Sequence, residues 1–374
     1  MIFTLILHMH PDLLYQLSLT LVPNIGPVQA KILLQHCEAE EIFHAKKSFL
    51  EKIEGIGPVK ADSIKKFNGF HLAEEEIKFI EKYKIKPLFV TDETYPKRLL
   101  NCYDSPTMLF YRGNADLNAP KIIAVIGTRS NTDYAKQITE KLLKDLSSLN
   151  VTIVSGLAYG VDAIAHKAAL KNNLPTIGVL AHGLDHIYPS EHTSLARDMV
   201  KNDGGLLTEF RRNTKPDKHN FPTRNRIVAG MSDATIVIET GLKGGSMITA
   251  ELANSYNKDV FALPGKVTDP KSAGCNYLIK NNKAMLLTDT QEIIEIMGWE
   301  EKKKSDSKKQ RELFIELSPE EKLIVDILKQ RESVHIDDIN NHSGLSSSAV
   351  AGAILSLELQ SVVLSLPGKL YRLA

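Results

Sequence analysis

The sequence predicts an α/β protein built around a doubly wound, mainly parallel sheet, with a small helical domain before it and a winged helix after it. Between residues 85 and 299, short apolar runs alternate with amphipathic helical patterns, as expected of βαβ units and a sheet covered on both faces. Before this region a Gly-Pro hairpin pattern occurs twice. After it, a charged stretch precedes a segment with helix caps and a hairpin turn.

The composition is that of an ordinary globular protein with room for two or three domains. The 374 residues are 43% hydrophobic and 24% charged, and the formal net charge is +1. Affinity for nucleic acid would therefore need a local concentration of cations. Cys37, Cys102 and Cys275 show no CxxC spacing, which predicts reduced thiols and no zinc site. The opening MIFTLILHMH is too short to span a bilayer, and we expect a cytoplasmic protein with no membrane span.

Residues 1–84 carry the repeated hairpin pattern and predict a helical domain of helix-hairpin-helix or SAM-like type. The copies are NIGPVQAKIL at Asn24–Leu33 and GIGPVKADSI at Gly55–Ile64. Such a glycine turn can expose backbone N–H groups to a phosphate, or it can simply join two packed helices. The first copy has few cations nearby, which favours the structural turn. The second has four, which leaves both interpretations open: Lys52, Lys60, Lys65 and Lys66.

The central domain, residues 85–299, is predicted from its short apolar runs. We expect strands at Ile122–Ile126, Val151–Ser155, Thr176–Leu180, Leu206–Glu209, Thr235–Glu239, Val260–Leu263 and Ala284–Leu287. In a doubly wound sheet, ligands bind at the carboxyl ends of the strands. The loops that follow these strands are therefore where we look for a site.

The C-terminal part divides into a linker and a winged helix. Residues 300–316 are charged and almost free of apolar side chains, which predicts a linker. In residues 317–374, a capping box at Ser318–Glu321 begins a helix, two more helices follow, and Pro367-Gly368 turns a hairpin. The expected recognition helix, Ser346–Gln360, contains no Lys or Arg. A reader of the DNA major groove needs cations, so this module is expected to bind protein or to pack on the core.

The loop after the first strand, Val125–Ala135, predicts a phosphate contact. It lacks the GxGxxG pattern of dinucleotide binding, and no Walker pattern occurs in the chain. Gly127, Thr128 and Arg129 nevertheless offer backbone N–H, a hydroxyl and a guanidinium at a helix entrance. The alternative for Arg129 is a salt bridge to a loop carboxylate such as Asp162.

Two further loops contribute candidates. Ser155 and Gly156 permit a close backbone approach after the second strand, and Gly245 and Ser246 open another helix as an anion cradle. Asp162 and His166 lie four residues apart on one face of the expected helix. They could act in acid–base catalysis, although such a pair more often stabilises its helix. No arrangement of serine, histidine and acid predicts a catalytic triad, and no spacing predicts a metal site.

The most cationic stretch of the central domain runs from Thr208 to Arg226. It holds six Arg or Lys and two Asp or Glu, a net charge of +4 on a chain whose total is +1. Cations that follow a backbone, with an aromatic ring for a base, are what single-strand binding requires. We therefore expect contacts from Lys218, Phe221, Arg224 and Arg226. The alternatives are that Phe221 is core, and that one of the two arginines is an internal brace.

Several segments together resemble the DNA-processing protein A (DprA/Smf) family. They are VIGTRSNTDYA, SGLAYGVDAIAH, GLDHIYPSEH, HNFPTRNRIVAGMSDATIVIE, GGSMITAELA, VFALPG and GCNYLIK. The resemblance implies an extended Rossmann core without a cofactor and without enzymatic activity. It also implies a homodimer that binds single-stranded DNA and loads the RecA recombinase onto it during natural transformation. By the same resemblance, Gly127, Thr128 and Arg129 contact phosphate, while Lys218 and Phe221 bind strand and base.

Four residues at three sites depart from the family pattern, and all of them concern the outer part of the proposed pocket. Tyr159 stands where relatives commonly have Arg, Ala181 and His182 stand in a Gly-Thr position, and Ser190 stands where some relatives have Lys. A rival interpretation is an enzyme related to nucleoside monophosphate phosphoribohydrolases. The segment LKGGSMITAE, which ends at Glu251, partly matches the glycine-rich loop of those enzymes. It lacks the proline and the third glycine of that loop.

Overall fold

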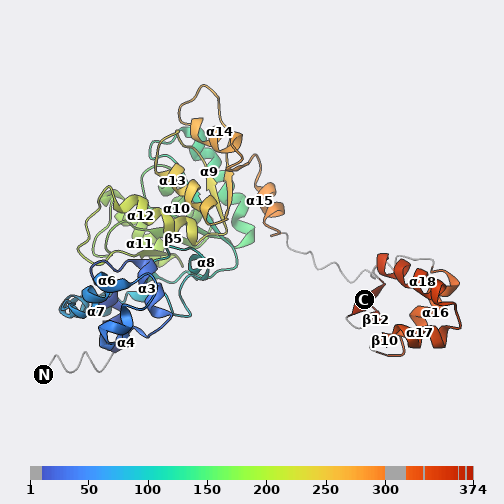
Figure 1. Ribbon diagram of the computed structural model, residues 1–374. Helices are drawn as coiled ribbons and strands as arrows, with labels where there is room; N and C mark the ends of the chain where they lie inside the picture. The colour runs from blue at the N-terminus through green and yellow to red at the C-terminus, as the bar shows by residue number, and fades with distance from the viewer. Residues whose placement is uncertain (1–10, 300–316, 332, 361, 367–368, 374) are drawn as a thin grey trace. The chain divides into compact units, whose positions relative to one another are not determined.

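The computed structural model describes residues 11–299 and 317–373, except 332, 361, 367 and 368 (Figure 1). The chain divides into two compact units, Met1–Glu300 and Glu301–Ala374. The predicted linker at 300–316, the turn at 367–368 and the opening ten residues lie outside the described residues. The division of the first unit at residue 84 stays a prediction, because the helices and the sheet share one hydrophobic core.

The first unit is built on a nine-stranded sheet with the order β1-β2-β6-β5-β4-β3-β7-β8-β9. The strands are β1 Lys86–Phe89, β2 Met108–Gly113, β3 Ile122–Ile126, β4 Thr152–Ser155, β5 Thr176–Val179, β6 Gly205–Thr208, β7 Ala234–Val237, β8 Asp259–Ala262 and β9 Met285–Leu286. From β6 to β9 all neighbours pair in parallel, which confirms the predicted α/β class. The antiparallel edge strands β1 and β2 were not predicted.

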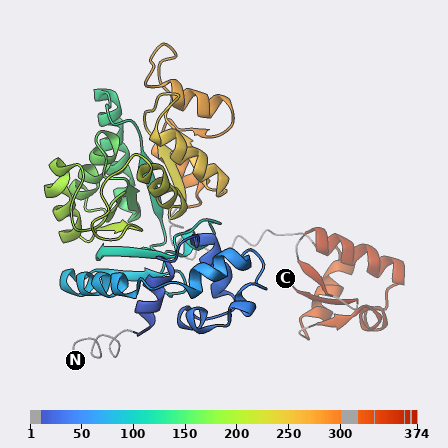
Figure 2. The ribbon, with the colours of Figure 1, turned by 60° about the vertical axis from the view of Figure 1, so that its left-hand side comes forward.

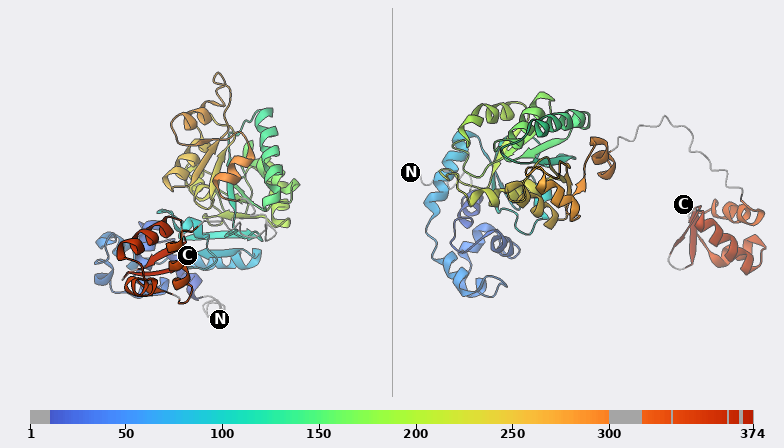
Figure 3. Two further views of the ribbon diagram at one scale, coloured as in Figure 1. Left: turned by 90° about the vertical axis from the view of Figure 1, so that its right-hand side faces the viewer. Right: turned by 90° about the horizontal axis from the view of Figure 1, so that it is seen from above.

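Alternate residues of the central strand β3 pack into two different hydrophobic cores. Ile122, Ala124 and Ile126 belong to the cluster that includes α12 (Asn220–Gly230) and α13 (Gly245–Ser255). Ile123 and Val125 pack with α9 (Asp133–Asp145) and α10 (Val161–Lys171). Successive side chains of a strand point to opposite faces, so an unbroken apolar run is buried on both. The turned views show these helix pairs on opposite sides of the sheet (Figures 2 and 3).

The described helices of the first unit, including the four named above, connect or flank the strands. They are α2 Pro11–Leu19, α3 Pro27–Leu34, α4 Ala39–His44, α5 Lys47–Leu50, α6 Gly57–Lys65, α7 Phe70–Tyr83, α8 Lys97–Leu100, α9 Asp133–Asp145, η1 Leu146–Leu149, α10 Val161–Lys171, η2 Ser190–His192, α11 Thr193–Lys201, α12 Asn220–Gly230, α13 Gly245–Ser255, α14 Ala273–Lys280 and α15 Thr290–Ile296. In the described parts of the chain, no helix is both long enough and apolar enough to cross a membrane.

The second unit is a winged helix, as predicted. Its elements are α16 Pro319–Leu328, β10 Val334–His335, α17 Ile336–Ser343, α18 Ser347–Leu359, β11 Val363–Leu366 and β12 Leu370–Leu373. The capping box forms, because the Ser318 hydroxyl accepts from the Glu321 amide while the Glu321 carboxylate accepts from the Ser318 amide. Gly344 ends α17 with a φ of 66°, a left-handed conformation that glycine adopts at little cost.

Candidate functional site

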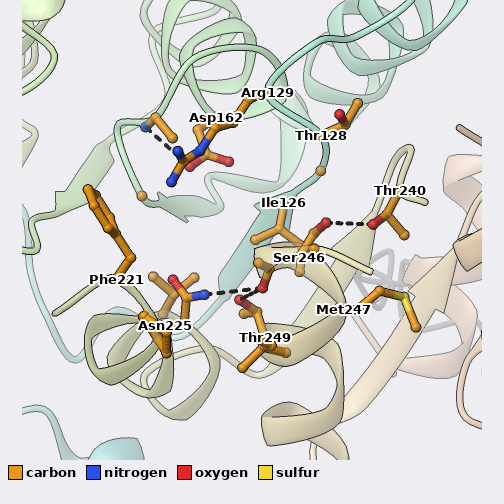
Figure 4. A pocket seen from close by; sticks show the side chains of 18 of the residues that line it. Ile126, Thr128, Arg129, Asp162, Phe221, Asn225, Thr240, Ser246, Met247 and Thr249 are labelled. Carbon is orange, nitrogen blue, oxygen red and sulfur yellow. Dashed lines mark hydrogen bonds between the residues drawn. The ribbon is translucent and has the colours of Figure 1, made fainter. Parts of the chain in front are cut away.

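A groove of about 1080 Å³ lies at the carboxyl ends of the central strands. The strand order reverses here: β4 follows β3 on one side, and β7 pairs with β3 on the other. The groove brings together most of the site residues predicted from the sequence. These are Gly127, Thr128, Arg129, Gly156, Lys218, Phe221, Arg224, Gly245 and Ser246. Ligands of doubly wound folds bind at such a reversal, so the groove is the candidate site (Figure 4).

The loop after β3 is fixed to its neighbours. The Thr128 amide donates to the Glu239 carbonyl at 2.7 Å, and the Thr132 hydroxyl donates to the Glu239 carboxylate at 2.8 Å. A Cβ on Gly127 would lie 2.5 Å from the side chain of Val161, so only glycine permits this packing. The backbone that carries Arg129 is therefore rigid, while the Arg129 side chain is exposed to solvent.

Arg129 and Phe221 meet across the groove. The Arg129 guanidinium lies 5.1 Å from the centre of the Phe221 ring, in cation–π contact, and the ring is half-buried. Lys218 is exposed three residues before Phe221, in the turn that precedes α12. Among the described residues, neither Arg129 nor Lys218 has a carboxylate partner in an ion pair, so both charges are available to a ligand. The alternative salt bridge from Arg129 to Asp162 does not form.

Arg224 lies beneath the groove and braces it. Its side chain is 4% exposed, and its guanidinium donates to the carbonyls of Gly156 and Val179. A Cβ on Gly156 would lie 2.5 Å from this guanidinium, so the glycine makes room for the arginine. Burial lowers the pKa of Arg224 to about 10, against the opposing influence of the buried Asp162 carboxylate. Arg224 stays charged, and its charge opposes the rise in the pKa of Asp162 that burial causes.

Arg226 and Ser155 have internal roles, in place of the ligand contacts expected from the sequence. Arg226 is 8% exposed, pairs with Glu209 and donates to the Asp104 carbonyl, away from the groove. The Ser155 hydroxyl is fully buried and donates to the Val125 carbonyl at 2.6 Å. The sequence predicted that one of the two arginines is a brace, and the structure shows that both are.

The amino-terminal end of α13 forms another wall of the groove. Gly245 and Ser246 line it, and the first amides of a helix have no intrahelical acceptor. Ser246 donates to the Thr240 hydroxyl at 2.7 Å, and Asn225 donates through its side chain to the Gly245 carbonyl at 3.1 Å. Asn225 is a buried lining residue that the sequence reasoning missed. Its signal was an amide between two arginines at the start of a buried helix.

The Asp162 and His166 pair braces its helix. The Asp162 carboxylate accepts from the Ala158 amide at 3.2 Å, and His166 shares a 2.7 Å hydrogen bond with the Thr176 hydroxyl. Burial lowers the pKa of His166 to about 3, which keeps the ring neutral. Among the described residues, no cluster of His, Cys, Asp or Glu could hold a metal ion. Burial also raises the thiol pKa values of Cys102 and Cys275, to about 11 and about 12.

At the second glycine hairpin, three of the four lysines are engaged within the protein. Lys60 donates to the Gly55 carbonyl at 2.6 Å, Lys65 donates to the Phe43 and Ala45 carbonyls, and Lys66 pairs with Asp62. The turn carries positive φ angles at Gly55 and Gly57. Of the two interpretations of this hairpin, these contacts favour the structural turn.

The fold and groove define a class: an α/β protein whose ligand site at the sheet reversal combines cations and an aromatic ring, without a dinucleotide fingerprint. Residues 86–298 match the family profile of DNA recombination-mediator protein A, and residues 310–369 match the DprA winged helix domain. The chain belongs to the DNA recombination-mediator protein A (DprA/Smf) family.

Relatives and solved structures agree with this assignment. Protein Smf of Synechocystis is 37% identical over 285 residues, which cover 74% of this chain and 71% of the relative. DNA processing protein DprA of Streptococcus pneumoniae is 40% identical over 225 residues, covering 60% and 76%. The X-ray structure of the S. pneumoniae protein aligns with a TM-score of 0.63 at 33% identity, over 75% of this chain and 95% of the other.

A second solved structure comes from Helicobacter pylori. It aligns with a TM-score of 0.52 at 34% identity, over 57% of this chain and 95% of the other. That structure is described as giving insight into the single-stranded DNA binding mode of DNA processing protein A from that organism.

Proposed function

We propose that this chain binds single-stranded DNA in the groove and acts as a recombination mediator. One observation carries the proposal: Arg129, whose guanidinium lies over the Phe221 ring, and Lys218 both line the groove and have no ion-pair partner among the described residues. Phosphates bind cations and free amides, and bases stack on aromatic rings, so this set suits a single strand. The single-strand binding named for the H. pylori relative supports the same assignment.

Each residue has a distinct role in this proposal. Arg129 holds a phosphate by a charge-assisted, bidentate contact, Lys218 neutralises the next phosphate, and Phe221 stacks a base. Because Arg129 already lies beside the Phe221 ring, one nucleotide can offer its phosphate and its base to the two side chains together. Duplex DNA hides its base faces, so the contribution of Phe221 is specific to single strands.

The wider role rests on the family resemblance. We propose that the chain protects incoming DNA in the cytoplasm, dimerises through the sheet unit and loads RecA onto the strand during natural transformation, without a cofactor. Sedimentation at micromolar concentration tests the dimer. RecA loading is tested by filament assembly on a strand already coated with single-strand-binding protein, with and without this chain.

Gel shifts with single-stranded and duplex oligonucleotides test DNA binding. Phe221→Ala should weaken single-strand affinity by roughly 1–3 kcal/mol, with little effect on duplex affinity. Arg129→Ala should weaken both, because both DNA forms carry phosphates. Circular dichroism controls for folding. A folded Phe221→Ala variant that binds single strands like the wild type would show that the ring only packs.

The rival enzymatic function is tested in the same preparations. Glu251 lines the groove near Gly244, but its carboxylate is paired with Lys283 at 3.3 Å. Incubation with AMP should release no adenine. Release that is abolished by Glu251→Gln would support the phosphoribohydrolase alternative and contradict the non-enzymatic role.

A further inference from the structure

A small second hollow of about 40 Å³ adjoins the groove beyond Phe221. The two hollows share six lining residues, so they are continuous: Arg129, Gly156, Ala158, Tyr188, Phe221 and Arg224. The second hollow adds Tyr159, His182 and Pro189 from the loops after β4 and β5. It is too small to enclose a base, so its exposed rings matter more than its volume.

Three aromatic side chains border the second hollow, and we name Phe221, Tyr188 and Tyr159 the aromatic ledge. The Phe221 and Tyr188 rings are in contact, with centroids 6.1 Å apart and planes tilted by 49°. Tyr188 is 46% exposed and Tyr159 is 41% exposed. Rings left this open beside a cationic groove offer faces on which a ligand can stack.

The ledge is held by buried neighbours. The Tyr188 amide donates to the ring of His182, which is 1% exposed, at 3.2 Å. The Tyr159 ring packs edge-on against His192 at 5.2 Å between centroids, and His192 shares a 3.0 Å hydrogen bond with the Leu157 carbonyl. The two tyrosines are therefore positioned by the fold before any ligand arrives.

We propose that Tyr188 and Tyr159 continue the base-stacking path of Phe221, so that a bound single strand leaves the groove along the aromatic ledge. This inference rests on the proposed binding of single-stranded DNA. The expected ligand is the run of nucleotides next to the one held by Arg129 and Phe221. Stacking on aromatic rings tolerates any sequence, because every base has a π-face.

The charges around the aromatic ledge favour contact with bases over contact with phosphates. Tyr159 lies beside Glu191, and hydrogen bonding to that carboxylate raises the pKa of the tyrosine. A carboxylate at this point repels phosphate, so the ledge should add affinity without releasing counterions. Removing its rings should weaken binding while leaving the salt dependence unchanged, unlike removal of Lys218.

The test is a salt titration of single-strand affinity for Tyr188→Ala, Tyr159→Ala and the double variant. Tyr188→Phe and Tyr159→Phe keep the rings and serve as matched variants. Tyr103→Ala controls for loss of an exposed tyrosine, since Tyr103 is 67% exposed and outside both hollows. The double alanine variant should lose about fivefold or more in affinity at every salt concentration, and each single alanine variant should lose less. The two phenylalanine variants and Tyr103→Ala should bind like the wild type.

A second measurement uses the unaltered protein. A strand with abasic sites flanking its central nucleotides should bind more weakly than the intact strand, and the double alanine variant should no longer distinguish the two. If Phe221→Ala weakens binding but the double variant matches the wild type, the ledge is wrong and the groove stands. If the wild type does not bind single strands at all, the proposed function itself fails.

Discussion

The rim and the floor of the groove use the same residue types for opposite purposes. At the rim, Arg129 and Lys218 are exposed and have no ion-pair partner among the described residues. At the floor, Arg224 is buried and donates hydrogen bonds to the Gly156 and Val179 carbonyls. The comparison shows that the number of cations in a segment does not measure its binding capacity. What matters is which of them remain without a protein partner.

One short segment supplies side chains both to the groove and to the protein interior, and helix geometry explains the difference. Phe221 lies in the first turn of α12 and faces the groove, while Arg224 follows one turn later. Residues two apart on a helix point about 200° from each other, so Arg224 and Arg226 reach different parts of the interior. Arg224 reaches the carboxyl ends of β4 and β5, and Arg226 reaches Glu209.

The largest expected effect is on the stability of the floor. Arg224→Met should lower the free energy of unfolding by about 3–6 kcal/mol, because it removes two charge-assisted hydrogen bonds to the Gly156 and Val179 carbonyls, each worth about 1.5–3 kcal/mol. Arg129→Met, the matched rim variant, should cost no more than about 1 kcal/mol, the worth of an exposed cation–π contact. Urea unfolding followed by circular dichroism measures both. Equal losses would remove the distinction between rim and floor.

Acid should lower the stability of the first unit through the buried His166 in α10. Its pKa is about 3 in the folded state, below the ordinary 6.5, so between these values only the unfolded chain takes up the proton. Stability should therefore fall as pH drops through this window, by at most about 1.4 kcal/mol per pH unit. Burial raises the pKa of Glu209 to about 7 from 4.5, which has the opposite sign and partly masks the loss above pH 4.5.

The measurement is the slope of unfolding free energy against pH for the wild type and His166→Gln. Below pH 4.5 the variant should lose less stability per pH unit than the wild type. Parallel slopes in that range would mean that the buried imidazole accepts a proton in the folded state.

A smaller effect should separate two lysines. Lys218→Ala should flatten the slope of log affinity against log salt by about 0.7 for a single strand, since one phosphate contact is lost. Lys60→Ala should leave the slope unchanged, because Lys60 is held by the Gly55 carbonyl at 2.6 Å. Fluorescence anisotropy across a salt series measures both. A change of slope for Lys60→Ala would restore the phosphate interpretation of the second hairpin.

The smallest effect is expected from removal of the winged helix. Its residues from Ser318 to Ala374 include five Lys or Arg and seven Asp or Glu, a net charge of −2. A chain ending at Glu300, the boundary between the two compact units, should keep single-strand affinity within about threefold of the full chain. A hundredfold loss in a folded truncation, roughly 2.7 kcal/mol, would place part of the DNA site in the second unit.

The sequence by itself determined the fold class, the positions of the central strands and the loops that carry the groove. Buried parallel strands are short unbroken apolar runs, so β3 was predicted at its observed bounds, Ile122–Ile126. The edge strands β1 and β2 escaped prediction. Proline in β1 weakens a strand pattern, and β2 pairs with a strand distant in sequence, since Phe110 lies opposite Thr208 of β6.

Only the tertiary structure decided which cations face the ligand and which face the protein. Nothing in the letters Arg-Asn-Arg distinguishes Arg224 from Lys218, because all are polar side chains near a helix start. Whether each cation is buried or exposed depends on carbonyls and carboxylates that folding brings within reach. These come from Gly156, Val179 and Glu209, which lie elsewhere in the sequence. A charge is buried only where such partners replace water, and those partners are set by packing across the whole sheet.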